Sequence, residues 1–242
     1  MTVLTAFQKL LKHLKFRREL QRPGEARRAD DPGTLKLFIY TLVSNLSKGQ
    51  WMPSSPLMLI QAAHFAAEKH KKQLRKGVDA TPYINHPLNV ARILVEEGGV
   101  VDHEVLAAAL LHDTIEDTQT TFQELRDRFG EVVAQYVQEV TDDKSIKEKA
   151  ERKRLQIEHA PHKSQGAALV KLADKTSNIR DVGADPPAHW DKQRRLEYLD
   201  WAEKVVEQLP IKDHKLNGIF ERSLAEARVR VMNAETRSST SS

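Results

Sequence analysis

The segment VLAAALLHDTIED, residues 105–117, carries the strongest structural signal in this chain of 242 residues. Its first seven residues are all apolar, so a helix formed by them must be buried on most of its sides. The next six positions hold four ionisable residues, namely His112, Asp113, Glu116 and Asp117. Charged side chains are costly to bury unless they are paired or bound to a metal ion. Because Glu116 and Asp117 share a helix face with Asp113, their repulsion calls for a cation, and we predict a metal site at this helix end.

Further ligands for such a cation occur elsewhere in the chain. His86 lies in a loop between Pro82 and Pro87, which restrict the backbone and fix the position of the imidazole. Asp174 lies in the apolar segment VKLADK, and Asn178 follows one helical turn later on the same face. Mixed nitrogen and oxygen ligation suits Mn²⁺, Fe²⁺ or Zn²⁺, and a site with open positions favours phosphate hydrolysis over a structural role. The predicted ligands of this single metal ion are His86, His112, Asp113 and Asp174.

Helical periodicity extends over most of the chain. Ser55 followed by Pro56 is typical of a helix start, and this helix is predicted to run to about Gln73. Thr121 and Glu124 form a capping box at the start of another helix. No segment alternates apolar and polar residues with the period of a strand, so we predict an all-α domain over residues 54–232. Further helices are predicted near residues 87–98, 102–111, 131–140, 148–159, 166–182, 191–208 and 214–230.

Cysteine is absent from the chain. This excludes a disulfide framework, a cysteine-ligated zinc or iron–sulfur site and a thiol nucleophile, and it fits a reducing compartment. No apolar run approaches the roughly 18–20 residues that a membrane span needs. We therefore expect a cytoplasmic protein without integral membrane association.

The net charge of +4 is unevenly distributed along the chain. Residues 1–50 contain ten Lys and Arg against four Asp and Glu, whereas residues 51–242 contain 28 against 30. The aromatic residues do not alternate with basic ones as they would on a nucleic-acid surface, so no nucleic-acid partner is expected. We predict a basic extension over residues 1–53, partly disordered or loosely docked, and a disordered tail over residues 233–242.

Several segments, in their order along the chain, resemble the hydrolase domain of the RelA/SpoT proteins. The resemblance is strongest to the small alarmone hydrolases that stand alone, such as the metazoan SpoT homologues. The matching segments are LRK at 74–76, TPYINHP at 81–87, AAALLHDTIEDT at 107–118, VTDDK at 140–144, ERKRLQ at 151–156, KLADK at 171–175 with Asn178, and EY at 197–198. The resemblance implies an HD-domain phosphohydrolase fold, a helical bundle with a mononuclear metal site. It also implies Mn²⁺-dependent removal of the 3′-pyrophosphate of guanosine tetra- or pentaphosphate (ppGpp or pppGpp), which gives GDP or GTP and pyrophosphate and ends the stringent response.

The same resemblance assigns roles around the metal site. It implies one Mn²⁺ per active site, with Zn²⁺ and Fe²⁺ as alternatives, held by His86, His112, Asp113 and Asp174. Glu116 and Asp117 match the acidic pair that lies beside the attacking water molecule in this family. A carboxylate in that position can accept a proton from the water, which agrees with general base catalysis.

The resemblance also points to residues that contact the anionic substrate. Arg75 and Lys76 match the basic pair that precedes the histidine loop of the family. Asn178, Arg194 and Tyr198 match positions that hold sugar or phosphate. Arg194 and Tyr198 are four residues apart, which places them on one helical face, and a planar guanidinium suits phosphate.

Two other functions remain open on the same site. One is a phosphatase that removes the 2′-phosphate of NADPH, because both substrates would place a ribose phosphate at the metal. The other is a non-catalytic module that senses a nucleotide, although the intact acidic pair argues against it. An HD nuclease or cyclic-dinucleotide hydrolase is disfavoured by the LRK and TPY segments. The predicted partner is a small-molecule nucleotide, and the oligomeric state is left open.

Overall fold

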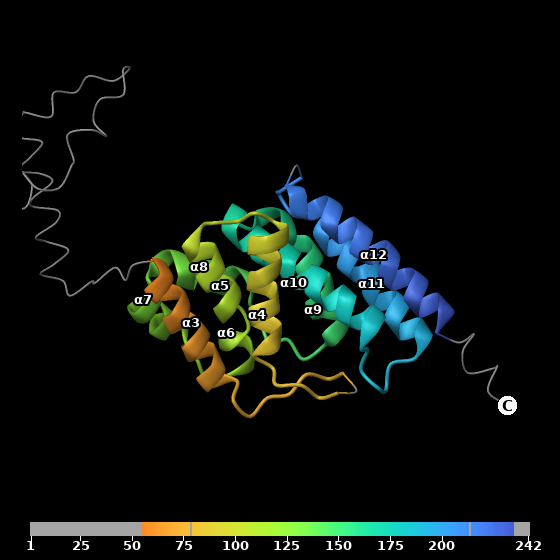
Figure 1. Cartoon of the computed structure of the whole chain (residues 1–242), viewed down its shortest axis with the longest axis horizontal. Helices are drawn as coiled ribbons and strands as arrows, with labels where there is room; N and C mark the ends of the chain where they lie inside the picture. Colours follow the sequence, from red (N-terminus) through yellow and green to blue (C-terminus); the bar gives the residue numbers. More distant parts are fainter. Residues whose placement is uncertain (1–54, 78, 213, 235–242) are drawn as a thin grey trace, which may run out of the picture. The chain divides into compact units, whose positions relative to one another are not determined.

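The computed structural model describes residues 55–77, 79–212 and 214–234. Within these residues every regular element is a helix, and the strand-like pairing is limited to an isolated bridge between Leu74 and Pro82 (Figure 1). This confirms the predicted all-α class. The elements are α3 (Ser55–Lys69), α4 (Asn85–Arg92), the π-helix η2 (Ile93–Glu97), α5 (His103–Leu111), α6 (Thr114–Asp117), α7 (Phe122–Phe129), α8 (Glu131–Val140), α9 (Lys149–His159), the 3₁₀-helix η3 (Ala160–His162), α10 (Gln165–Ala184), α11 (Lys192–Glu207) and α12 (Lys215–Asn233). The predicted extension over residues 1–53 and residues 235–242 of the predicted tail lie outside the described residues.

The apolar helix α5 lies inside the fold. All seven residues from Val105 to Leu111 are buried, as the sequence predicts. Asp102 caps the start of the helix, because its carboxylate accepts a hydrogen bond from the backbone N–H of Glu104 at 2.9 Å. The helix packs against α3, α4, α8 and α10. His112, which directly follows it, is therefore still buried, and the polar residues begin inside the protein.

Helix α10 joins the two halves of the bundle. It packs against α4, α5 and α8 on one side and against α11 and α12 on the other (Figure 1). The eight residues 170–177 are all buried, and they include Asp174 and two lysines. A buried acid in the middle of such a helix must meet partners from the neighbouring elements. The fold thus brings α10 against the C-terminal end of α5.

The segment between α3 and α4 departs from the predicted helix. α3 ends at Lys69 rather than near Gln73, and residues 70–73 form a turn in which the N–H of Gln73 donates to the carbonyl of His70 at 2.8 Å. The chain then doubles back: the N–H of Arg75 donates to Thr81 (2.8 Å), and the N–H of Tyr83 donates to Gln73 (2.9 Å). These long-range backbone bonds compete with continuation of the helix. They place Arg75 and Tyr83 in one loop beside the end of α5.

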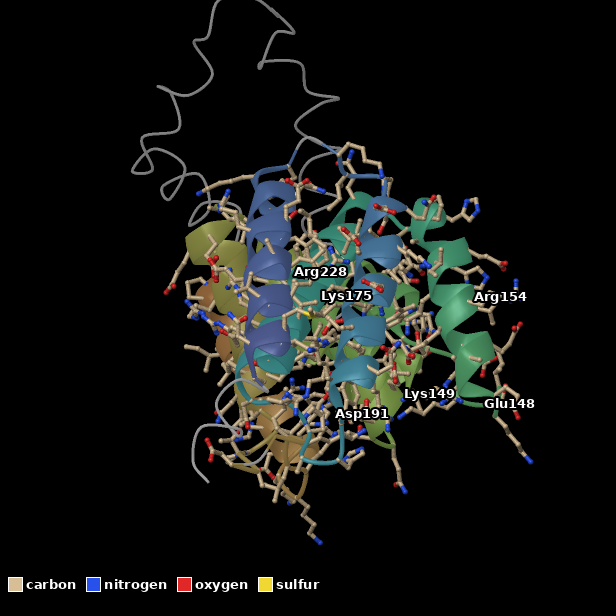
Figure 2. All side chains as sticks on the ribbon, turned by 90° about the vertical axis from the view of Figure 1, so that its right-hand side faces the viewer. Glu148, Lys149, Arg154, Lys175, Asp191 and Arg228 are labelled. Atoms are coloured by element: carbon tan, nitrogen blue, oxygen red, sulfur yellow. The ribbon has the colours of Figure 1, made fainter. Side chains whose placement is uncertain are left out.

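Helices α9, α11 and α12 complete the bundle. α11 packs on both α9 and α12, and Lys149 at the start of α9 lies at the same end of this layer as Asp191, which precedes α11 (Figure 2). No helix in the described part of the chain is long and apolar enough to cross a membrane.

Candidate active site

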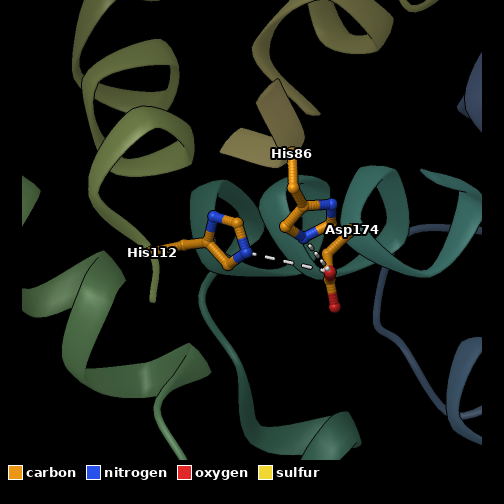
Figure 3. Close-up of side chains that lie close together, drawn as sticks. All are labelled: His86, His112 and Asp174. Atoms are coloured by element: carbon orange, nitrogen blue, oxygen red, sulfur yellow. Dashed lines mark hydrogen bonds and ion pairs between the residues drawn. The ribbon is translucent and has the colours of Figure 1, made fainter. Parts of the chain in front are cut away.

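Three side chains from three different helices meet in the interior. His86 comes from α4, His112 follows α5, and Asp174 lies in the middle of α10 (Figure 3). Asp174 Oδ1 lies 3.2 Å from His86 Nε2 and 3.8 Å from His112 Nε2. Each residue offers one ligand atom within 4.8 Å of the others, and all three residues are buried. This spacing suits a single metal ion bound by two nitrogens and one oxygen.

The outer nitrogens of both imidazoles are fixed by neighbouring groups. His112 Nδ1 donates to the carbonyl of Ala109 at 2.8 Å. His86 Nδ1 lies 3.3 Å from the hydroxyl of Ser177, which also accepts a hydrogen bond from Asn89 at 3.0 Å. Both Nε2 atoms are thereby directed at Asp174, and His112 Nε2 is buried. Such second contacts orient metal-binding histidines, so the donor set fits a divalent cation.

Asp113 lies against the same cluster. Its Oδ2 is 3.0 Å from His112 Nε2 and 3.8 Å from His86 Nε2. The hydroxyl of Tyr83 donates to this oxygen at 2.5 Å. The four residues predicted as ligands thus lie close to one another, and the hydrogen bond from Tyr83 orients the Asp113 carboxylate toward the two histidines.

The ionisable groups of the cluster shift one another's pKa values. Burial acts to lower the pKa of His112, but Asp113 and Asp174 more than offset this and raise it to about 9. Burial alone would raise the pKa of Asp113 and of Asp174. The neighbouring His112 and Lys175, respectively, outweigh burial and hold both pKa values below the ordinary range. The buried carboxylate of Asp174 and the half-buried one of Asp113 therefore stay ionised, which is the charge that a divalent cation requires of its ligands.

The predicted acidic pair occupies the short helix α6, where Glu116 lines both a cavity and an adjoining cleft and Asp117 lines the cleft alone. Glu116 lines a cavity of about 140 Å³ together with the metal-binding cluster, and its Oε2 accepts a hydrogen bond from the N–H of Asp142 at 3.1 Å. Burial, and then the charge of Asp142, raises the pKa of Glu116. Asp117 instead faces an adjoining cleft and accepts hydrogen bonds from Lys144 (2.6 Å) and Gln73 (2.9 Å).

The cleft has a volume of about 930 Å³ and shares lining residues with the cavity. Arg75 and Asn178 lie at the junction: Arg75 donates to Asn178 Oδ1 (3.2 Å) and to Asp181 (2.5 Å), and Asn178 donates to Asp174 (2.6 Å). Lys76 and Arg194 are exposed along the cleft. The structure brings all five residues predicted to contact substrate to this one cleft, which are Arg75, Lys76, Asn178, Arg194 and Tyr198.

An aromatic group forms one wall of the cleft. The ring of Tyr198 lies 5.4 Å from that of Trp190 and 5.3 Å from that of Trp201. Burial raises the pKa of Tyr198 to about 12, although Lys175 acts in the opposite direction, so its hydroxyl stays protonated. Arg194 lies over the ring of Trp190 at 4.9 Å. The sequence analysis identified Tyr198 but not the two tryptophans that hold it.

Two further cations line the cleft to which the sequence analysis assigned no role, although one of them lies in the ERKRLQ segment. They are Lys149 and Lys153, four residues apart on α9, and they line the cleft together with Arg194 and Lys76. The pKa values of both lysines are lowered by burial and then by repulsion, from Arg194 at Lys149 and from Lys149 at Lys153. A cluster of mutually repelling cations facing an open cleft is suited to a polyanionic ligand.

Comparison of this chain with known proteins identifies its family. A model of the HD domain matches residues 62–199. A guanosine-3′,5′-bis(diphosphate) 3′-pyrophosphohydrolase MESH1 from Xenopus tropicalis is 56% identical over 173 residues, which cover 70% of this chain and 96% of that protein. The chain belongs to the MESH1 family of HD-domain hydrolases. The MESH1 protein of Homo sapiens is 55% identical over 158 residues, or 65% of this chain and 88% of its own length.

A solved structure supports membership in the MESH1 family independently. It is described as a metazoan ortholog of SpoT that hydrolyses ppGpp and plays a role in starvation responses, and it aligns with a TM-score of 0.61 at 43% identity. The alignment covers 75% of this chain and 94% of that one. These matches confirm the resemblance and the HD-domain fold predicted from the sequence. Every residue predicted for the site, from Arg75 to Tyr198, lies inside the range matched by the HD-domain model.

Proposed function

We propose that this chain is a metal-dependent hydrolase that removes the 3′-pyrophosphate of ppGpp and pppGpp. The observation that carries the proposal is the meeting of His86, His112 and Asp174 in a cavity that shares lining residues with a cleft lined by cations. The proteins it resembles throughout this region are named for the same reaction. The chemistry of the site agrees with it, because such a substrate carries negative charge at both its 3′ and 5′ ends.

His86, His112, Asp113 and Asp174 would hold the cation in this proposal. Mn²⁺ is the expected ion, with Zn²⁺ and Fe²⁺ as alternatives, because all three accept imidazole and carboxylate ligands. A divalent ion at this position supplies positive charge against the phosphoryl oxygens and lowers the pKa of a nearby water molecule. The cavity beside the cluster also contains Glu116, so the group that would accept a proton is already adjacent.

The proposed reaction breaks the bond between the ribose 3′-oxygen and the first phosphorus of the 3′-pyrophosphate. A water oxygen forms the new bond to that phosphorus, Glu116 takes one proton of the water and later releases it to solvent, and the departing 3′-oxygen takes up a proton from solvent. A carboxyl whose pKa is raised by burial is a stronger base than an exposed one, which suits this role. Asp117 would assist from the mouth of the cleft, where Lys144 and Gln73 hold its carboxylate.

The residues along the cleft would bind and orient the nucleotide. Arg75 and Asn178 stand closest to the metal-binding cluster and are placed to meet the ribose and 3′-phosphates. Lys76 and Arg194, which both line the cleft, would neutralise the remaining phosphates. The wall formed by Tyr198 offers flat aromatic surface to the rest of the nucleotide.

The test is product analysis with purified protein loaded with Mn²⁺. The protein is incubated with ppGpp and, separately, with NADPH, and the Asp113→Ala variant runs alongside. GDP and pyrophosphate from ppGpp, absent with the variant, would support the proposal. Phosphate released from NADPH with ppGpp untouched would replace the proposed function by a 2′-phosphatase. Metal-loaded protein that turns over neither nucleotide would favour a sensing role.

The proposed site of action is the cytoplasm, which fits the absence of cysteine from the chain.

A further inference from the structure

A buried histidine outside the metal-binding cluster is connected to the acidic pair. His70 is only 2% exposed and lies directly after α3. Its Nδ1 is 2.8 Å from Gln73 Oε1, and Gln73 Nε2 donates to Asp117 Oδ2 at 2.9 Å. One amide side chain therefore links a buried imidazole to a carboxylate of the proposed active site. None of the roles assigned above uses His70 or explains why it is buried there.

The direction of both hydrogen bonds follows from the chemistry of the three groups. An ionised Asp117 can only accept, so the NH₂ group of Gln73 must face it and the amide oxygen must face His70. The imidazole must then donate from Nδ1, which leaves Nε2 without a proton in the neutral ring. His70 Nε2 is indeed buried without a hydrogen-bond partner among the described residues. With the amide reversed, two oxygen atoms would oppose each other at the contact with Asp117.

The same turn supports a second carboxylate of the site. The N–H of Tyr83 donates to the backbone carbonyl of Gln73 at 2.9 Å, and the rings of Tyr83 and His70 lie 4.9 Å apart. Tyr83 in turn donates its hydroxyl to Asp113. Residues 70–73, which we call the His70 turn, thus place both the donor to Asp117 and the donor to Asp113.

We propose that His70 and Gln73 are positioning residues for the hydrolysis, because together they fix the orientation of the Asp117 carboxylate beside Glu116. Lys144 holds the other oxygen of Asp117 at 2.6 Å, so the carboxylate is held from two sides. This inference rests on the proposed function for its effect on turnover, but the hydrogen-bonded chain itself does not depend on which nucleotide is cleaved. His70 lines neither the cavity nor the cleft and is not expected to touch the substrate or the metal ion, whereas Gln73 lines the cleft beside Asp117.

The activity test compares variants along this chain of contacts. Gln73→Leu should lower kcat on ppGpp by roughly tenfold to a hundredfold, the range for losing a hydrogen bond to a charged group. His70→Leu loses a bond to a neutral amide and should lower kcat by roughly twofold to tenfold with KM nearly unchanged, and both variants should keep their bound metal. His70→Asn offers an amide N–H near the position of Nδ1 and should recover part of the loss. His64 is an exposed histidine on α3, the helix that precedes His70, and His64→Leu is the matched control that should behave like the unmodified protein.

A variant that adds a charge at Gln73 distinguishes a loss of Asp117 positioning from a general loss of packing. The titratable groups around Asp117 are Lys144 from the loop after α8, Glu116 from α6 and Tyr83 from the loop before α4. Gln73→Glu keeps the size of the half-buried side chain but sets a second carboxylate against Asp117. The acidic limb of the kcat profile should therefore move to higher pH. Unchanged kcat and pH profiles in Gln73→Leu and Gln73→Glu would overturn the proposal.

A spectroscopic test needs no substrate. In ¹⁵N-labelled metal-loaded protein, the neutral ring of His70 should carry its proton on Nδ1, and Gln73→Leu should remove that preference. A proton on Nε2 in the unmodified protein would overturn the proposal whatever the activity. If the unmodified protein leaves ppGpp intact yet shows the Nδ1–H form, the proposed function fails while the hydrogen-bonded chain stands.

Discussion

At the residue scale, the site depends on which nitrogen of each histidine remains free. His112 uses Nδ1 on the carbonyl of Ala109, and His86 turns Nδ1 toward Ser177. Both contacts come from buried helices, so the two Nε2 atoms are aimed at Asp174 before any cation arrives. A site arranged in this way binds a metal without reordering its ligands, which favours both affinity and a defined geometry.

Replacing one of these ligands should remove metal and activity together. We expect His112→Ala to lower metal affinity by on the order of a hundredfold or more, because a lost ligand should cost at least as much as a lost supporting contact. Bound metal after dialysis and turnover of ppGpp are measured on the same sample. His103→Ala, at the other end of α5, is the control. Full metal content in His112→Ala would show that the cation binds elsewhere.

Glu116 should be needed for turnover but not for metal binding. Glu116→Gln removes the proposed proton acceptor and should lower kcat by roughly a hundredfold to ten-thousandfold while the metal content stays normal. A variant that keeps the metal and turns over normally would exclude Glu116 as the base.

The pH dependence of the unmodified protein tests the same role. Burial and the charges of Asp142 and Asp113 raise the pKa of Glu116, whereas Lys171 lowers it; Lys144 lies 3.9 Å away. The basic form exists above the pKa, so kcat should fall as the pH drops through a value higher than that of an exposed glutamate. The kcat profile of the metal-loaded protein measures this, and a fall that begins only at the ordinary glutamate pKa would contradict it.

At the scale of elements, local signals predicted most helix ends. α8 occupies residues 131–140 as predicted, because Gly130 adopts a φ of 91° that other residues avoid. The end of α3 could not be predicted, because the residues after Lys69 contain no helix breaker. Helix α3 ends there because the backbone of Thr81 and Tyr83 pairs with the residues that would continue it, and such long-range pairing has no local signal.

The cap of α5 should contribute measurable stability, because this helix carries the start of the site. Asp102→Ala removes the acceptor for the N–H groups of Glu104 and Val105 and should lower the free energy of unfolding by about 1 kcal/mol. Asp102→Asn keeps an acceptor oxygen and should lose much less. Urea denaturation of the metal-free proteins measures both variants. Equal stabilities of the two variants would show that the cap does not hold the helix.

At the scale of the whole molecule, the site lies where the two halves of the bundle meet. His86 and His112 come from one side of α10, whereas Tyr198 comes from α11 on the other. The sequence could predict these residues because the family motifs mark them. It could not single out Lys149 and Lys153, because a basic helix face looks the same whether it faces water or a cleft. Only the packing of α9 against α11 determines whether this basic face lies toward water or toward the cleft.

The cations on α9 should therefore control substrate affinity rather than chemistry. Lys149→Gln with Lys153→Gln should raise the KM for ppGpp by roughly tenfold and leave kcat nearly unchanged, because the two removed charges line the cleft and not the cavity that holds His86, His112 and Asp174. Added salt should raise the KM of the unmodified protein more steeply than that of this double variant, because screening acts on charges that are still present.

A control variant with the same change in net charge can be made on the nearby surface outside the cleft. Lys147 and Arg154 are exposed and outside the cleft lining, and Arg154 is paired with Glu151 and Glu158 (Figure 2). Lys147→Gln with Arg154→Gln changes the net charge by the same amount as the cleft variant. If attraction of the whole molecule governed binding, the two double variants would raise KM equally. If the cleft binds the phosphates directly, only the variant at Lys149 and Lys153 should do so. Equal effects would therefore reject the cleft assignment even with the active site intact.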